Sequence, residues 1–215
     1  MAYTGEVTVG GVPAVRELAD LTITKVSVGP MDNNAYLLRS GDDQILIDAA
    51  NDAGTLLTLI GPAGLSKVLT THRHGDHWQA LTEVIEKTGA ESLAHIADAA
   101  EIPVVNRDLR EGETIEVGAT SLEVINLVGH TPGSIALLYQ DPSGGAHLFT
   151  GDSLFPGGVG NTRGDKDNFT SLINDVEQKL FDRLPDDTWF YPGHGNDSTL
   201  GDQRPHLKEW RDRGW

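Results

Sequence analysis

Five of the eight histidines in this 215-residue chain lie beside or near glycine or aspartate, at positions that follow predicted strands. They are His72, His74, His77, His130 and His194. Three of them fall with Asp76 inside the segment Thr71-His72-Arg73-His74-Gly75-Asp76-His77. Imidazoles separated by one residue point the same way on extended chain, and imidazole and carboxylate are common ligands of transition metals. One short loop can therefore offer ligands to two neighbouring metal ions.

Three later segments have the same character, with one ligand-type residue just past a predicted strand and glycine beside it. They are Gly129-His130-Thr131-Pro132-Gly133, Thr150-Gly151-Asp152-Ser153 and Pro192-Gly193-His194-Gly195. Glycine lets the backbone pass close to a bound ion. Any one segment alone is also explained as an ordinary turn that contains a polar residue. The metal-site interpretation explains all of them together.

Composition narrows the chemistry and the partners. The chain has no cysteine, which excludes disulfides, thiolate metal sites and cysteine nucleophiles. Its formal charge of -16 repels phosphate backbones and anionic lipid, so we expect no nucleic acid and no membrane among its partners, and a small molecule as its substrate. Residues 1–10 lack the basic and apolar runs of a secretion signal. A cytoplasmic location is the prediction.

The elements that must position these residues alternate between strands and helices. Apolar runs predict strands at residues 21–28, 35–39, 44–48, 67–71, 121–128, 134–140, 146–150 and 188–191. Helical spacing predicts helices at 52–61, from the histidine loop to Gly89, at 169–181 and at 203–213. Asp76 and His77 are expected to enter the second of these helices. The pattern favours one domain over residues 1–215, an α/β four-layer α/β/β/α sandwich with two sheets packed face to face and helices outside.

The order T-H-x-H-x-D-H, G-H-T-P-G, G-D-S-L-F and P-G-H-G resembles the metallo-β-lactamase superfamily, and within it glyoxalase II (hydroxyacylglutathione hydrolase) and its short relatives. The match runs from about Leu21 to His194. It implies the metallo-β-lactamase fold and a metal-dependent hydrolase. It also implies that His72, His74 and His130 bind one metal ion, that Asp76, His77 and His194 bind a second, and that Asp152 bridges the two.

Asp48 matches the earliest acidic position of the family. The resemblance implies that it supports the histidine loop without binding a metal ion itself. A strand-end aspartate that caps the following turn explains the same residue equally well.

Charge explains why such a set would work. Two divalent cations about 3.5 to 4 Å apart repel each other, and a bridging carboxylate and hydroxide offset that repulsion. Neutral imidazoles leave enough positive charge to lower the pKa of bound water, so that the hydroxide becomes the nucleophile. Asp152 would hold both ions and Asp76 would orient the hydroxide, which makes these two the predicted catalytic residues. The ligands suit zinc, iron and manganese, and we expect two Zn²⁺ ions.

The segment Gly157 to Lys166 follows Asp152 and is rich in glycine, with Asn161, Arg163 and Lys166 as candidate substrate-binding residues. It either holds an acidic substrate tail or is a solvated loop.

The resemblance to glyoxalase II predicts a thioester substrate, a 2-hydroxyacyl ester of a small thiol. Glyoxalase II binds glutathione largely through a C-terminal extension, whereas this chain ends at Trp215, so weak binding of the thiol is expected. The alternatives are a mononuclear iron persulfide dioxygenase and a lactone or β-lactam hydrolase of the same fold. A metal-binding or scaffold protein without activity would need its open coordination positions blocked.

Overall fold

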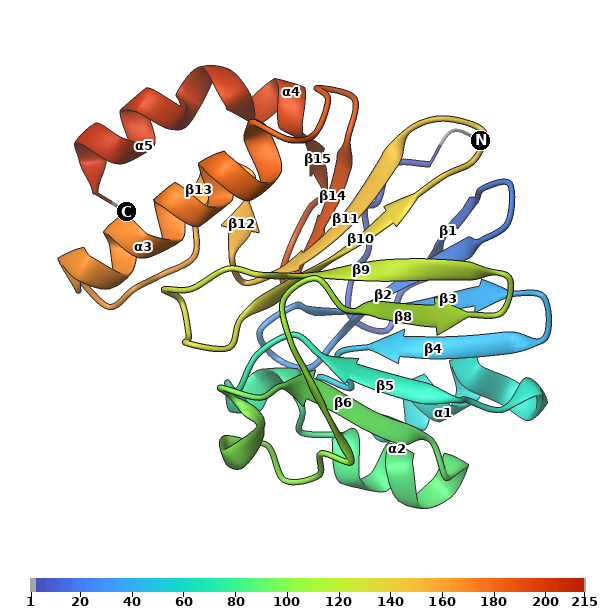
Figure 1. Ribbon diagram of the computed structural model, residues 1–215. Coiled ribbons are helices and arrows are strands. Elements are labelled where there is room, and N and C mark those ends of the chain that lie inside the picture. Colours follow the sequence, from blue (N-terminus) through green and yellow to red (C-terminus); the bar gives the residue numbers. More distant parts are fainter. Residues whose placement is uncertain (1–2, 215) are drawn as a thin grey trace.

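Two sheets packed face to face form the centre of the protein, which a computed structural model describes over residues 3–214 (Figure 1). Seven strands in sequence order make the first sheet. They are β1 (Ala14–Glu17), β2 (Thr22–Val28), β3 (Asn33–Ser40), β4 (Asp43–Ile47), β5 (Lys67–Thr70), β6 (Glu91–His95) and β7 (Arg107–Leu109). Neighbours are antiparallel from β1 to β4 and parallel from β4 to β7. The parallel strands therefore all end at one edge of the sheet.

The second sheet has the strand order β15-β14-β11-β10-β9-β8. These strands are β8 (Thr114–Val117), β9 (Thr120–Asn126), β10 (Ile135–Gln140), β11 (Ala146–Gly151), β14 (Trp189–Pro192) and β15 (Ser198–Thr199). A separate hairpin pairs β12 (Leu154–Phe155) with β13 (Gly158–Val159). Because β11 and β14 are parallel, the residues that follow both strands also meet at one edge.

Helices cover the outer face of each sheet (Figure 1). The first sheet carries α1 (Ala53–Ile60) and α2 (Leu81–Thr88), and the second carries α3 (Lys166–Asp175), α4 (Leu200–Gln203) and α5 (Leu207–Arg213). Three apolar cores fill the spaces between these layers: one between the sheets and one beneath each helix layer. The predicted α/β/β/α sandwich is confirmed. No helix among residues 3–214 combines the length and the apolar character that crossing a membrane requires.

Three helix boundaries differ from the sequence prediction. Asp76 and His77 lie in a short 3-10 turn, Gly75–His77, and α2 begins only at Leu81. The predicted helix over 169–181 is α-helical to Asp175 and continues as the π-helical turn Val176–Phe181. At the C-terminus Pro205, which has no backbone N–H to donate, lies in the 3-10 turn Arg204–His206 that separates α4 from α5. Short 3-10 turns also occur at Gly61–Ala63 and Ala99–Glu101.

Candidate metal centre

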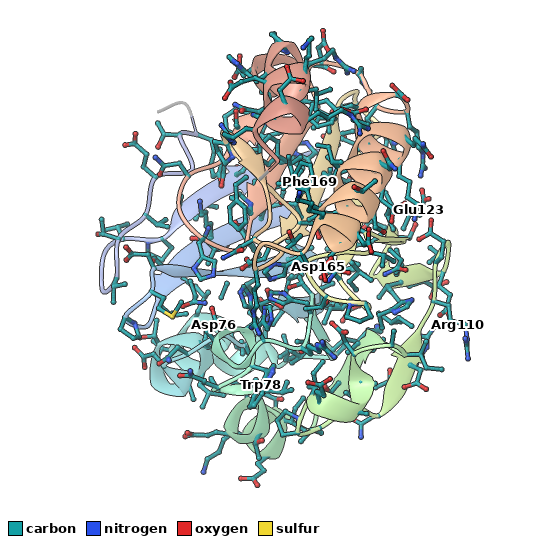
Figure 2. The ribbon with its side chains drawn as sticks, turned by 90° about the vertical axis from the view of Figure 1, so that its left-hand side faces the viewer. Asp76, Trp78, Arg110, Glu123, Asp165 and Phe169 are labelled. Atoms are coloured by element: carbon teal, nitrogen blue, oxygen red, sulfur yellow. The ribbon has the colours of Figure 1, made fainter. Side chains whose placement is uncertain are left out.

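All seven predicted metal ligands lie in one cluster at the edge where strands of both sheets end. Their ligand atoms form three overlapping groups, and within each group all atoms lie within 4.8 Å of one another. The groups are His72 with His74 and His130, then His72 with His77 and Asp152, then Asp76 with His77 and His194. Figure 2 faces this edge and shows Asp76 on the side of the first helix layer, near Trp78, with Asp165 across from it at the start of α3. We call these seven residues the candidate ligands.

One half of the cluster consists of three histidines. His130 Nε2 lies 2.9 Å from His74 Nδ1 and 3.3 Å from His72 Nε2. His72 and His74 come from the loop after β5, whereas His130 follows β9 on the other sheet. The two sheets must therefore pack against each other for this half to form.

The other half joins Asp76, His77 and His194. His77 Nε2 lies 3.2 Å from His194 Nε2, and Asp76 Oδ2 lies 3.3 Å from His194 Nε2 and 3.5 Å from His77 Nε2. His194 follows β14 and is held there by a bridge between its backbone and that of Asn33. This half also combines residues from both sheets.

Asp152 lies between the two halves. Its Oδ2 is 3.7 Å from His130 Nε2 and 3.5 Å from His194 Nε2, while its Oδ1 is 3.4 Å from His77 Nε2. Oδ1 is buried and makes no hydrogen bond. Gly193 leaves the space for this carboxylate, because a Cβ there would lie 2.2 Å from Oδ1. A buried carboxylate oxygen with no hydrogen-bond donor fits a cation as its partner.

The outer nitrogens of four histidines determine which atoms face the centre of the cluster. Backbone carbonyls accept from Nδ1 of His130 and of His194, at Asn161 O (2.8 Å) and Met31 O (2.9 Å). His77 Nδ1 lies 2.8 Å from Asp48 Oδ2. An acceptor at Nδ1 requires the proton there, so in the neutral imidazole it is Nε2 that turns an unshared electron pair inward.

His72 follows the same pattern. Its Nδ1 lies 3.0 Å from Thr71 Oγ1, whose own proton is donated to Asp48 Oδ2 at 2.8 Å. The hydroxyl is therefore the acceptor and His72 Nδ1 the donor. Several electron pairs that converge without protons between them match the requirements of divalent cations, so the residues present fit a metal centre.

Burial and the neighbouring charged groups both shift the pKa values of the candidate ligands. Burial lowers the pKa of His72 well below its ordinary value, with a further lowering from His77, and burial also lowers the pKa of His74 and His130. These three histidines are therefore neutral at pH 7. Burial disfavours the ionised form of Asp152, yet the imidazoles of His77 and His194 outweigh it and hold the pKa of that carboxyl well below its usual range.

The pKa of His77 and that of His194 move the opposite way. Burial disfavours their protonation, but the nearby carboxylates, Asp152 above all, raise the pKa of both. This half of the cluster therefore attracts positive charge, as a site with two anionic ligands should.

Asp48 connects the loop after β5 to the cluster. Its Oδ1 accepts from the Thr71 backbone N–H at 2.7 Å, and its Oδ2 accepts from the Thr71 hydroxyl and from His77. The carboxyl is 2 % exposed, and its residue has a left-handed backbone with φ of 58°. The contacts support both interpretations of this residue, because it orients His77 while it stabilises the turn.

Two residues that hold candidate ligands in place were not predicted from the sequence. Asp98, 1 % exposed, accepts from the backbone N–H of Arg73 (3.0 Å) and of Gly133 (2.9 Å) and from the Thr131 hydroxyl (2.5 Å), and so joins the two loops that carry His72, His74 and His130. Asn33 donates its side-chain amide to Asp76 Oδ2 at 2.9 Å. Asp98 follows β6, so its place after a buried strand, the same signal that marked Asp48, could have identified it.

The three candidate substrate-binding residues differ in how they contact the cluster. Arg163 reaches the cluster, with Nη2 3.3 Å from His74 Nε2. Asn161 contributes its backbone carbonyl to His130, and its side chain accepts from the Arg163 backbone N–H at 2.7 Å. Lys166 begins α3 with an exposed side chain, and among the described residues no hydrogen bond or ion pair joins it to the cluster. The structure therefore gives no support to Lys166.

Two mixed sheets enclosed by helices, with imidazoles and carboxylates gathered at their common edge, define a class of α/β/β/α metalloproteins. The model of the metallo-beta-lactamase superfamily matches residues 28–194, and the chain belongs to that superfamily. The predicted family and fold are thus confirmed.

Relatives make the comparison more specific. The chain is 40 % identical to a hydroxyacylglutathione hydrolase of Fuscovulum blasticum over 133 residues, which are 60 % of this chain and 51 % of that one. It therefore spans about half the length of that relative. It is 32 % identical to the probable metallo-hydrolase YqgX of Bacillus subtilis (strain 168) over 206 residues, 85 % of this chain and 96 % of that one. The crystal structure of TTHA1623 in a di-iron-bound form superposes with a TM-score of 0.71 at 30 % identity, covering 84 % of this chain and 96 % of that one.

Proposed function

We propose that this protein is a dinuclear metal-dependent hydrolase that cleaves a thioester, a 2-hydroxyacyl ester of a small thiol. The position of Asp152 between two groups of three candidate ligands is the observation that carries the proposal. A centre for one ion would leave either the three-histidine group or the Asp76 group without a role. The similarity to hydroxyacylglutathione hydrolases supports the thioester as substrate.

His72, His74 and His130 would hold one ion, Asp76, His77 and His194 the other, and Asp152 both. Two bound divalent ions supply a water of lowered pKa as the nucleophile and polarise the carbonyl group of the substrate. The ligand set suits zinc, and a relative that binds two irons makes iron the main alternative.

Asp76 is placed to orient the attacking water. Burial alone disfavours the ionised form of Asp76, but His77 and the amide of Asn33 lower its pKa, so Asp76 is ionised and held at a fixed angle. An ionised, oriented carboxylate accepts a hydrogen bond from the attacking water and directs its lone pair at the carbonyl carbon.

The kind of leaving group that can depart depends on whether a side chain near the site can supply it with a proton. Among the described residues, the polar side chains that contact the candidate ligands from outside the set are Asp48, Thr71, Asn33 and Arg163. The Asp48 carboxylate is occupied as an acceptor from Thr71 and His77, and hydroxyl, amide and guanidinium groups are not the usual general acids of enzymes. An amide nitrogen must be protonated to leave, whereas a thiolate leaves without a proton. The site therefore suits a thioester better than a peptide or other amide.

The surroundings of the cluster indicate how a thioester would lie. Arg163 places a guanidinium beside His74. Near His194, Met31 has a side chain that is 59 % exposed and the ring of Phe155 lies 6.4 Å from the imidazole. The oxygen-rich acyl end would thus contact Arg163, and the apolar sulfur-bearing end would contact Met31 and Phe155.

Steady-state kinetics test the substrate class. S-lactoylglutathione and lactoyl esters of smaller thiols should be hydrolysed, with kcat similar among thiols and differences confined to KM, since in this arrangement the thiol end would lie against apolar side chains away from the reacting carbonyl group. A lactone, a β-lactam and a glutathione persulfide with oxygen uptake are the comparison substrates. Faster turnover of any of these three than of every thioester would refute the thioester assignment.

A further inference from the structure

Lys25 is a fully buried lysine far from the candidate ligands in the sequence and close to one of them in space. Its side chain, on β2, is 0 % exposed and all three of its protons have acceptors. Nζ donates to Gly5 O (2.8 Å), to Gly195 O (2.8 Å) and to Asp197 Oδ1 (2.6 Å). An ammonium group has three donors, so this environment satisfies Lys25 completely.

The partner of Lys25 is satisfied in the same way. Asp197, whose side chain is also 0 % exposed, accepts at Oδ2 from the Tyr3 hydroxyl (2.9 Å) and from Trp189 Nε1 (3.2 Å). The fit is close: a Cβ on Gly5 would lie 2.2 Å from this oxygen. Three parts of the chain, at residues 3–5, at Lys25 and at residues 189–197, thus converge on one ion pair.

A buried ion pair contributes little to stability on balance, because removing both charges from water offsets their attraction. Apolar side chains of similar volume would fill the space at least as favourably. The position of the pair in the fold, and what its hydrogen bonds hold, are therefore more informative than its energy.

Those hydrogen bonds hold the loop that carries His194. Gly195 O, one residue beyond His194, accepts from Lys25 Nζ and also from Asn34 Nδ2 at 2.9 Å. Asn34 Nδ2 donates to Pro192 O as well, and the Asn34 backbone N–H donates to Gly193 O at 2.8 Å. The backbone on both sides of His194 is therefore attached to β2 and β3, while its imidazole is oriented by Met31 O.

From this arrangement we infer that Lys25 and Asp197 are positioning residues that set the place of His194, and with it the half of the metal centre formed by Asp76, His77 and His194. The inference rests on the proposed function, since it assigns His194 to the second ion. The three-histidine half is held separately, through Asp98, so the two halves can be weakened one at a time.

The experiment compares Lys25→Met with Asp98→Asn in the zinc-loaded 215-residue chain. Methionine has nearly the length of lysine and no charge, so it fills the space without holding Gly195 O. Competition with a chromophoric chelator measures the affinity for each zinc ion. Removing a residue that supports a metal ligand costs about 10- to 100-fold in affinity. In Lys25→Met the affinity for one zinc ion should therefore fall about tenfold or more, while the affinity for the other stays nearly unchanged. In Asp98→Asn the affinity for the other zinc ion should fall.

Nuclear magnetic resonance on protein labelled with ¹⁵N-histidine identifies the half that is affected, independently of metal number. Hydrogen exchange of the His194 Nδ1 proton, which is bonded to Met31 O, should be about tenfold faster in Lys25→Met, while exchange at His130 Nδ1 stays as in the wild type. Leu180→Ala, in the core beneath α3, is the control for a general loss of stability.

The outcomes separate the two proposals. One zinc ion in the wild type, together with faster exchange at His194 in Lys25→Met, would refute the dinuclear centre and support the role of Lys25. Unchanged exchange at His194 in a folded Lys25→Met variant would overturn the role of Lys25, as would equal acceleration at His194 and His130 of the kind expected for Leu180→Ala. Should Lys25→Met fail to fold because Asp197 is left buried without its partner, the double variant Lys25→Met with Asp197→Asn, which removes both charges, is measured in the same way and judged by the same criteria.

Discussion

Asp48 Oδ2 lies 2.8 Å from His77 Nδ1, and this contact determines which nitrogen of His77 faces the metal centre. Asp48→Asn keeps the size of the side chain but offers an amide that can turn its own N–H toward His77. We expect kcat/KM and the affinity for one metal ion to fall about 10- to 100-fold, as for other residues that support a histidine ligand.

Asp52→Asn is the matched control for this variant. Asp52 also has a left-handed backbone, but its side chain caps α1 at Thr55 and has no contact with the cluster among the described residues. Activity and metal content of Asp52→Asn should equal those of the wild type. An Asp48→Asn protein with full activity would show that Asp48 serves the turn alone.

Removal of metal should abolish activity. The proposed centre predicts about two metal ions per chain by elemental analysis after purification without added metal. Chelator treatment should remove them together with activity, and zinc should restore both. A content that stays at one ion per chain when metal is in excess would instead favour the mononuclear iron dioxygenase.

Asp152→Ala should affect both ions. Because Asp152 lies within 3.7 Å of His77, His130 and His194, its removal takes away the one carboxylate shared by both halves. We expect lower occupancy of both ions and loss of turnover, with the circular dichroism spectrum preserved since the three cores are apolar. Turnover at the wild-type rate in the folded variant would refute the bridging role.

His147 gives the protein a pH-dependent stability that is separate from the metal centre. Burial, together with Arg16, lowers the pKa of His147 from 6.5 to about 4, and its Nδ1 lies 2.9 Å from the Tyr191 hydroxyl. The unfolded chain therefore binds more protons than the folded one between these two values. The free energy of unfolding is therefore highest above pH 6.5, where His147 is neutral in both states. It falls as the pH drops toward 4, by about 2 kcal/mol between pH 7.5 and pH 5.

Urea denaturation of the wild type and of His147→Gln at both pH values measures this effect. Glutamine can still accept from Tyr191 but does not titrate. The wild type should lose about 2 kcal/mol more than the variant on going to pH 5, since contributions from the metal ligands are common to both proteins. Equal losses would show that His147 is not held neutral by the fold.

The sequence determined the candidate ligands to a greater extent than the residues that orient them. The chemical character of His72, His74, Asp76 and His77 was predictable because they lie in one short loop, where local geometry alone brings ligands together. Likewise the apolar runs predicted the sandwich, because strands between two layers must be apolar on both faces.

Only the tertiary structure decided how these ligands are held. Lys25 and Asp197, or Asp98 and Thr131, are separated by long stretches of chain, and nothing in the local pattern relates one to the other. Hydrogen bonds of this kind depend on the register and packing of both sheets, which the sequence pattern does not define. The helix boundaries around His77 and after Asp175 were missed for a related reason, since tertiary packing, at the site for His77 and in the core beneath α3 for residues 176–181, overrides the local preference for a regular helix. The sequence alone thus determined which side chains could bind metal, whereas the packing of the sheets decided which groups orient them and which charges are buried to do so.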